Sequence, residues 1–218
     1  MNPPHTYPKS PNFSLVLVLL FPICLLSCAA PKTHTIFLQY RQPEAHTSVS
    51  SLTVGLAPFQ DLRSSPKSLG ERIRPDGKTE PIVLGTPAPY EDLTLIVRRY
   101  LQDHGIRVVD LLSWTPDPQT LGELPEEIQV AILGKIDDLE VHAESTIVKT
   151  MVQYRVLLSA HMGIKEKGEV ITRKIEVSPR TTLLGFRAEE IEKELNDALA
   201  EAVNRLFEGL LIEKPQAQ

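Results

Sequence analysis

Cysteine is scarce in this sequence: the only two, Cys24 and Cys28, lie within the first 28 of its 218 residues. No disulfide can therefore form in the rest of the chain, and no thiol is available there for catalysis. A chain of ~190 residues does not need a disulfide, because it can bury close to 70% of its unfolded surface. We expect an ordinary apolar core to stabilise the folded part.

Short motifs that carry catalysis are also absent. The sequence has no Gly-x-Ser-x-Gly elbow, no phosphate-binding loop and no His-Glu-x-x-His run. Asp137 and Asp138 are a conceivable acid and base, but adjacent residues of a strand point to opposite faces. We predict that the protein is not an enzyme.

One group of side chains has the chemistry of metal ligands. Glu140, His142 and Glu144 alternate along a predicted strand, so they share a face, and His161 lies on the next strand. A metal site would require these groups to converge within coordination distance. A solvated strand end is the alternative, and we favour it, so we predict neither a metal nor another cofactor.

Near the N-terminus an apolar run is too short to span a bilayer. Leu15–Leu26 is a dozen residues, whereas a transmembrane helix needs roughly 20. Lys9 is the only charged residue in the first 27. A polar start, an apolar stretch and small residues at the end are typical of a secretory leader. We predict that residues 1–27 are a cleaved signal peptide.

The end of this leader, Leu25-Leu26-Ser27-Cys28, resembles the lipobox of bacterial lipoproteins. The resemblance implies that Cys28 is acylated and becomes the first residue of the mature protein. Several acyl chains hold a protein firmly, whereas one holds it only marginally. A plain secretory signal with an incidental cysteine is the alternative.

The residue after Cys28 bears on localisation. Ala29 stands where an aspartate would retain an enterobacterial lipoprotein in the inner membrane. The resemblance therefore implies an outer-membrane lipoprotein that faces the periplasm, with residues 28–33 as its tether.

Acidic residues outnumber basic ones. Residues 28–218 hold 22 Lys and Arg against 28 Asp and Glu, a net charge of −6. An acidic body binds nucleic acid poorly, so we expect no nucleic-acid partner. The negative net charge also disfavours attachment to anionic lipid through a cluster of basic side chains. The acyl chains are therefore the expected membrane anchor.

Hydrophobic periodicity predicts one folded domain over residues 34–210, followed by a flexible tail at 211–218. Period-two alternation predicts strands at 35–40, 52–57, 106–112, 128–144, 146–164 and 170–177. Helical spacing predicts helices at 90–104 and 187–208, each followed by a capping glycine, Gly105 or Gly209. We predict an α+β fold: a two-layer sandwich whose mainly antiparallel sheet of about five or six strands is covered by two helices.

Residues 60–89 lack a strong core pattern, apart from a hairpin expected around the turn at 74–77. Connections of this length are usually functional or mobile. We predict an interaction loop here, with the following candidate residues: Asp61, Arg63, Lys67, Arg72 and Arg74. Asp61 and Arg63 are either a recognition feature or a local salt bridge that ends a strand, and we favour the second.

The layout also resembles the YajG-type bacterial lipoproteins. Val54, Asp61, Arg63 and Gly70 carry the resemblance, together with the lipobox, the helix at 90–104, the paired strands and the long C-terminal helix. It implies a periplasm-facing outer-membrane lipoprotein without an established enzymatic role.

Two classes of function remain open. The first is a binding or assembly module of the cell envelope that docks an envelope protein through its loops or a sheet edge. An accessory lipoprotein of lipid or lipopolysaccharide transport is a variant of it. The second is an envelope hydrolase with acidic residues as acid and base. We favour the first.

Overall fold

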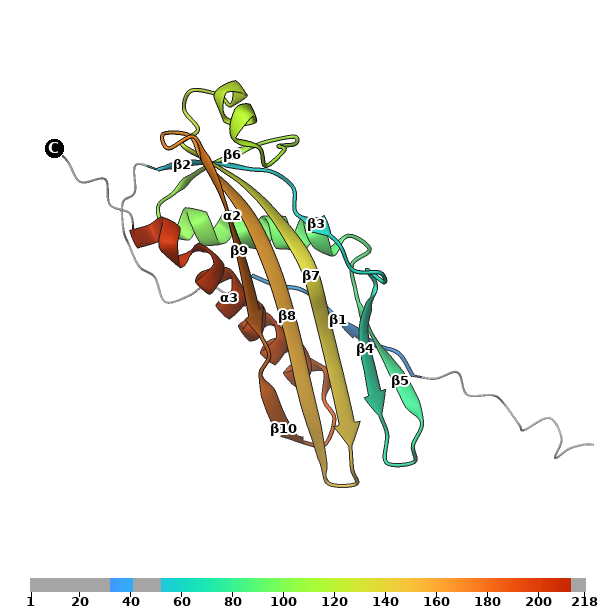
Figure 1. Ribbon diagram of the computed structural model, residues 1–218. Helices are drawn as coiled ribbons and strands as arrows, with labels where there is room; N and C mark the ends of the chain where they lie inside the picture. The colour runs from blue at the N-terminus through green and yellow to red at the C-terminus, as the bar shows by residue number, and fades with distance from the viewer. Residues whose placement is uncertain (1–31, 41–51, 213–218) are drawn as a thin grey trace, which may run out of the picture. The chain divides into compact units, whose positions relative to one another are not determined.

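Two 16-residue strands form the centre of the structure, β7 (Val130–Ser145) and β8 (Lys149–Ile164). They pair with each other along their whole length in an antiparallel hairpin (Figure 1). The computed structural model describes residues 32–40 and 52–212. The predicted signal peptide, Cys28 and residues 213–218 lie outside the described residues.

Each long strand is flanked by shorter strands placed end to end. The free side of β7 pairs in parallel with β2 (Thr53–Leu56), β3 (Gln60–Asp61) and β4 (Ser68–Ile73). The free side of β8 pairs antiparallel with β9 (Glu169–Val177) and β10 (Arg180–Leu184). A strand of 16 residues is ~50 Å long, so a single strand of ordinary length cannot cover it.

The remaining strands extend the sheet at two places. β5 (Thr79–Leu84) forms the predicted hairpin with β4, and β1 (His34–Ile36) pairs in parallel with β5. β6 (Arg107–Asp110) pairs in parallel with β2, which therefore lies between β6 and β7. All four residues of β2 are buried, as expected for a strand with a neighbour on each side.

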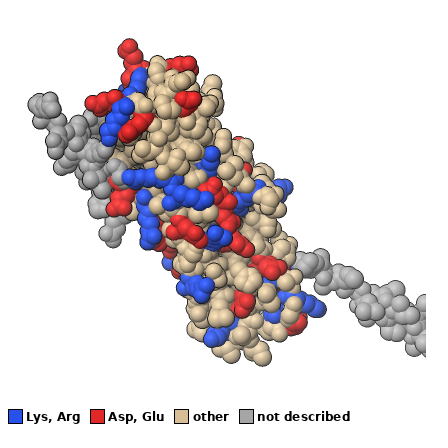
Figure 2. Space-filling model, in the orientation of Figure 1, with Lys and Arg blue, Asp and Glu red and all other residues tan. Residues whose placement is uncertain are grey.

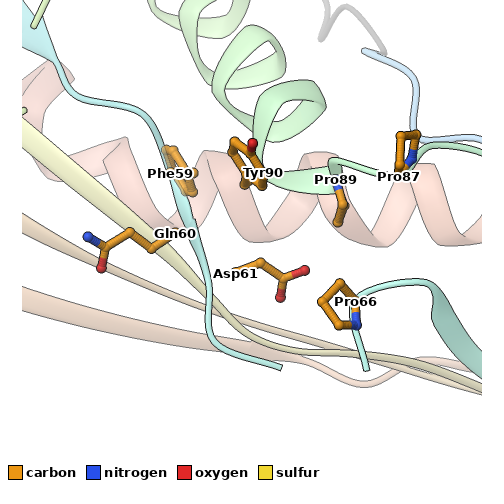
Figure 3. A pocket seen from close by; sticks show the side chains of 7 residues that line it. All are labelled: Phe59, Gln60, Asp61, Pro66, Pro87, Pro89 and Tyr90. Atoms are coloured by element: carbon orange, nitrogen blue, oxygen red, sulfur yellow. The ribbon is translucent and has the colours of Figure 1, made fainter. Parts of the chain in front are cut away.

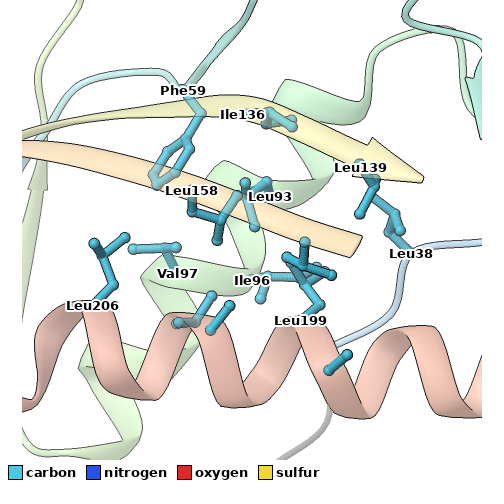
Figure 4. Close-up of a cluster of buried hydrophobic side chains, with 14 of the residues drawn as sticks. Leu38, Phe59, Leu93, Ile96, Val97, Ile136, Leu139, Leu158, Leu199 and Leu206 are labelled. Atoms are coloured by element: carbon cyan, nitrogen blue, oxygen red, sulfur yellow. The ribbon is translucent and has the colours of Figure 1, made fainter. Parts of the chain in front are cut away.

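Two helices pack on one face of the sheet, α2 (Pro89–Asp103) and α3 (Ala188–Ile212). The core lies between the helices and the sheet. It is filled by apolar side chains from both helices and from the inward-facing positions of β7 and β8 (Figure 4). Its members include Leu93, Val97, Leu158, Leu199 and Leu206. No helix within residues 32–40 and 52–212 has the length and hydropathy required to cross a bilayer.

A bulge keeps β7 facing the helices along its full length. The register shifts between Ile136 and Asp138, so the buried positions change from even to odd numbers. Ile132 and Ile136 precede the bulge and Leu139 and Val141 follow it, all in the same core. A β-bulge accommodates one extra residue in this way.

A smaller cluster covers part of the opposite face. The segment after β6 carries Trp114 and the 3₁₀ helix η2 (Pro118–Glu123), which place Trp114 and Leu121 against Ala131 and Leu133 of β7. Gly163 of β8 permits this, because a Cβ there would lie 2.4 Å from Leu121 and 2.6 Å from the indole.

The rest of that face carries charged side chains in cross-strand pairs. Arg155 contacts Asp138 at 3.4 Å and Glu176 at 3.1 Å, and Lys174 lies 3.6 Å from Asp137. Figure 2 shows opposite charges next to one another across the middle of the molecule. Such pairs suit a solvated sheet surface.

The predicted fold class is wrong in its sheet. A single mixed, curled sheet of ten strands replaces the two-layer sandwich with five or six mainly antiparallel strands. Among the described residues, five of nine strand pairings are parallel. The error arose because the flanking strands are short, and because parallel neighbours come from distant parts of the sequence.

The helices occur where the periodicity predicts them, with one difference at an end. Gly105 follows α2 with φ 75°, as the predicted cap. α3 does not end before Gly209, because it continues to Ile212.

Candidate binding cleft

Asp61 and Arg63 form a buried, two-point ion pair at the end of β3. Arg63 Nε donates to Asp61 Oδ1 at 2.9 Å and Nη2 donates to Oδ2 at 2.8 Å. The two side chains are only 5% and 6% exposed. The same guanidinium also donates to the carbonyls of Pro66, Ser68 and Leu139. Arg63 therefore ties the segment between β3 and β4 to β7.

This pairing sets the charge of Asp61. Burial by itself raises the pKa of the carboxyl, but the hydrogen bonds and positive charge of Arg63 outweigh it and hold that pKa below its usual value of 3.8. Asp61 is ionised at neutral pH, and both of its oxygens are occupied. It is poorly suited to act as a general acid or base.

A cleft of about 320 Å³ lies next to this ion pair (Figure 3). It runs between β3, the segment before β4 and the N-terminus of α2. Its lining is rich in aromatic rings and prolines, with two polar side chains: Phe59, Gln60, Asp61, Pro66, Pro87, Pro89 and Tyr90. Concave sites with a mainly apolar lining and a few polar groups are typical of ligand-binding surfaces.

Local contacts fix the walls of the cleft. Thr94 of α2 accepts a hydrogen bond from the Phe59 amide at 2.9 Å and donates to the carbonyl of Tyr90 at 2.6 Å. The Phe59 ring lies directly over Gly134 of β7, where a Cβ would come within 2.0 Å of it. A glycine is therefore required at this point for the ring to lie flat against the strand.

The five residues of the predicted interaction loop do not form one surface. Asp61 and Arg63 are turned into the structure, and only Asp61 lines the cleft. Lys67 is exposed, and Arg74 is 42% exposed at the β4–β5 turn, where it contacts Asp76 at 3.3 Å. Arg72 points toward the core side of the sheet.

Arg72 belongs to a buried polar network that crosses five strands. Its Nη1 donates to Glu80 at 2.9 Å, and its Nε donates to Ser145 Oγ at 2.9 Å. Glu80 also contacts His34 Nε2 at 2.8 Å, and Ser145 Oγ contacts Thr150 Oγ1 at 2.9 Å. The ring of Phe186 covers the guanidinium at 4.2 Å.

Charge pairing sets the ionisation of Glu80 in this network. Burial raises the pKa of Glu80, but hydrogen bonds from His34 and Arg72 and the charge of Arg72 together lower it below 4.5. The network has a structural role at the edge of the core and is not a recognition surface. Sequence reasoning missed this network. The predicted turn at 74–77 could have indicated part of it, because a hairpin around that turn pairs Arg72 with Glu80.

The candidate metal ligands do not converge. His142 pairs across the sheet with Gln153, whereas His161 pairs with Leu133, far along the same hairpin. His142 contacts only Glu144 of the candidate set, at 3.3 Å. Within the described residues, no group of three His, Cys, Asp or Glu side chains is placed to hold a metal ion.

Comparison with solved structures identifies the fold. Protein XCC0632 of Xanthomonas campestris, described as DUF330, superposes with a TM-score of 0.53 at 16% identity, over 83% of this chain and 95% of that one. The similarity is one of fold. Lipoprotein GNA1162 of Neisseria meningitidis matches with a TM-score of 0.37 at 9% identity, over 72% and 99% of the two chains, which is too low to support an argument.

Searches by sequence gave no relative. No protein-family model matches the chain, and no curated protein matches it. The resemblance to YajG-type lipoproteins therefore remains a prediction.

Proposed function

We propose that this protein is an outer-membrane lipoprotein, anchored through acyl chains on Cys28, whose folded unit faces the periplasm. The unit is a non-catalytic module that binds another protein of the cell envelope. The anchoring part is supported by the leader that ends in Leu25-Leu26-Ser27-Cys28.

The observation that carries the binding part is the cleft beside the Asp61–Arg63 pair. Tyr90, Pro66 and Pro87 are exposed there, and the Phe59 ring forms its floor against β7. Rigid aromatic and proline side chains lose little conformational entropy when a partner covers them. The cleft suits an apolar side chain or a short turn of a partner protein.

Two features favour binding over hydrolysis. The carboxylate that lines the cleft is already held by Arg63 at both oxygens. The surrounding wall is fixed by backbone and side-chain hydrogen bonds, as a docking surface requires.

Site-specific photo-crosslinking tests this function. A benzophenone amino acid replaces Tyr90 in the full chain, expressed in a Gram-negative host, and the same probe at Leu112 is the control. Leu112 is fully exposed and lies beyond β6. We expect a discrete crosslinked protein from position 90 and none from position 112.

A second arm tests whether the cleft itself is responsible. The probe is placed at the exposed Gln60 with and without Pro87→Arg, which puts a bulky charge into the cleft. We expect the substitution to abolish the crosslink. Equal crosslinking in both backgrounds, or equal products from positions 90 and 112, would refute the cleft as the binding site.

A further inference from the structure

Exposed apolar side chains gather at one end of the sheet, at the turn between β7 and β8. Ile147 is 93% exposed, Val148 71% and Leu184 78%. Leu184, at the end of β10, pairs with Lys149, and the following amide, that of Gly185, donates to the Val148 carbonyl at 3.2 Å. We call Ile147, Val148 and Leu184 the apolar tip. Three large, highly exposed apolar side chains on adjoining stretches of backbone indicate a surface that contacts something else.

The described chain begins in the half of the sheet that carries the apolar tip. By strand register, His34 of β1 lies level with Ile82 of β5, Gly70 of β4 and Val141 of β7. Val141 is six residues before Ile147, which is ~20 Å along the strand. Three strand spacings separate β1 from β7, which is about 15 Å in a sheet. Figure 1 shows the β7–β8 and β4–β5 turns at this lower end.

The tether is short compared with these dimensions. Six residue steps lead from Cys28 to His34, and an extended chain of that length reaches ~20 Å at most. A tether of this length can reach a membrane at the end of the sheet that carries the apolar tip. It cannot reach one at the opposite end, because Val130 is eleven residues, or ~36 Å, from Val141 along β7. A protein partner far from the membrane would not require an apolar contact surface at this end of the sheet.

We propose that the apolar tip inserts into the surface of the same membrane that holds Cys28, as a second point of attachment. This inference rests on the anchoring in the proposed function. The three apolar side chains enter the boundary between headgroups and acyl chains, and the ammonium of the exposed Lys149 meets lipid phosphates.

Two attachments fix the orientation of the folded unit. β7 rises away from the tip, and β3 pairs with it at Lys135 and Ile136, about nine residues before its end. That spacing holds the cleft ~30 Å from the membrane surface. The module then presents its binding cleft at a defined height instead of swinging on its tether.

A fluorescent probe in the intact lipoprotein tests this. Ile147→Cys and, as control, Leu112→Cys are labelled with an environment-sensitive NBD dye; with Cys28 acylated and Cys24 removed with the leader, the introduced thiol is the only one. Each lipidated protein is reconstituted in vesicles of phosphatidylethanolamine and phosphatidylglycerol. We expect the probe at 147 to gain emission at shorter wavelength and to be quenched by spin-labelled lipid, and the probe at 112 to show neither effect.

The outcomes separate the two proposals. If intact mass shows acyl chains on Cys28 but the probe at 147 behaves like the probe at 112, the tip proposal is wrong and the anchor stands. If the mass shows no acyl chains, both are wrong. A response at 147 that depends on protein concentration without vesicles would mean that the tip binds a second copy, which also overturns the membrane contact.

Discussion

Arg72 and Glu80 form an ion pair of 2.9 Å in which the glutamate is only 5% exposed and the arginine is covered by Phe186. Removing one partner of a buried ion pair leaves an uncompensated charge. We expect Arg72→Leu to lower the free energy of unfolding by about 3 kcal/mol, measured by urea denaturation with Trp114 fluorescence.

Arg74→Leu is the matched control for this prediction. Arg74 also contacts Glu80, but at 3.5 Å and with 42% of its side chain exposed. Replacing Arg74 should lower the free energy of unfolding by less than about 1 kcal/mol. Equal losses for the two variants would contradict the structural role assigned to Arg72.

Acid should destabilise the fold through Glu80 and Asp61. Both carboxyls have folded-state pKa values below their usual 4.5 and 3.8, so their stabilising contribution is present above these values. It is lost as the pH falls through the lower, folded-state values. We expect the free energy of unfolding to decline from about pH 4.5 downward. The double variant Glu80→Gln, Asp61→Asn, itself less stable at neutral pH, should show a shallower decline, whereas parallel pH profiles would count against these two groups.

Gly134 should be intolerant of any side chain, because a Cβ there would lie within 2.0 Å of the Phe59 ring. We expect Gly134→Ala to cost about 1–3 kcal/mol by overpacking. The substitution should cost much less in a Phe59→Leu background. Gly122→Ala is the control, since nothing lies within 4 Å of that position, and a loss of similar size there would point to a general backbone effect.

Two buried tyrosines should respond differently to removal of the hydroxyl. Tyr100 donates to Asn204 Oδ1 at 2.9 Å, whereas the buried hydroxyl of Tyr154 has no hydrogen-bond partner among the described residues. We expect Tyr100→Phe to cost about 1 kcal/mol and Tyr154→Phe to be neutral or to stabilise by roughly 1 kcal/mol. A clear loss for Tyr154→Phe in urea denaturation would show that its hydroxyl is satisfied in solution.

Strong local patterns predicted most of the elements. The alternation in residues 128–164 and the apolar stripes of the two helices matched β7, β8, α2 and α3, because each signal lies within one stretch of sequence. β3 and β10 were missed. β3 has two residues, and β10 has no buried residue, so neither carries a hydrophobic period.

Long-range pairing was the part that sequence could not supply. Nothing near Leu52 or Gly70 indicates that β2, β3 and β4 line the same edge of β7. Asp61 and Arg63 were found because they are two residues apart, but nothing in the sequence indicated that Arg63 also donates to the carbonyl of Leu139, 76 residues away. The role of Arg72 depends equally on Ser145, 73 residues away.

Lipidation of Cys28 is the claim on which the whole account depends, and intact mass combined with membrane fractionation tests it most directly. The full chain and a Cys28→Ala variant are expressed side by side in a Gram-negative host. We predict that the native form carries the added mass of acyl chains and sediments with the outer membrane, and that the variant does neither. If both forms are soluble and unmodified, the anchored-module account is contradicted.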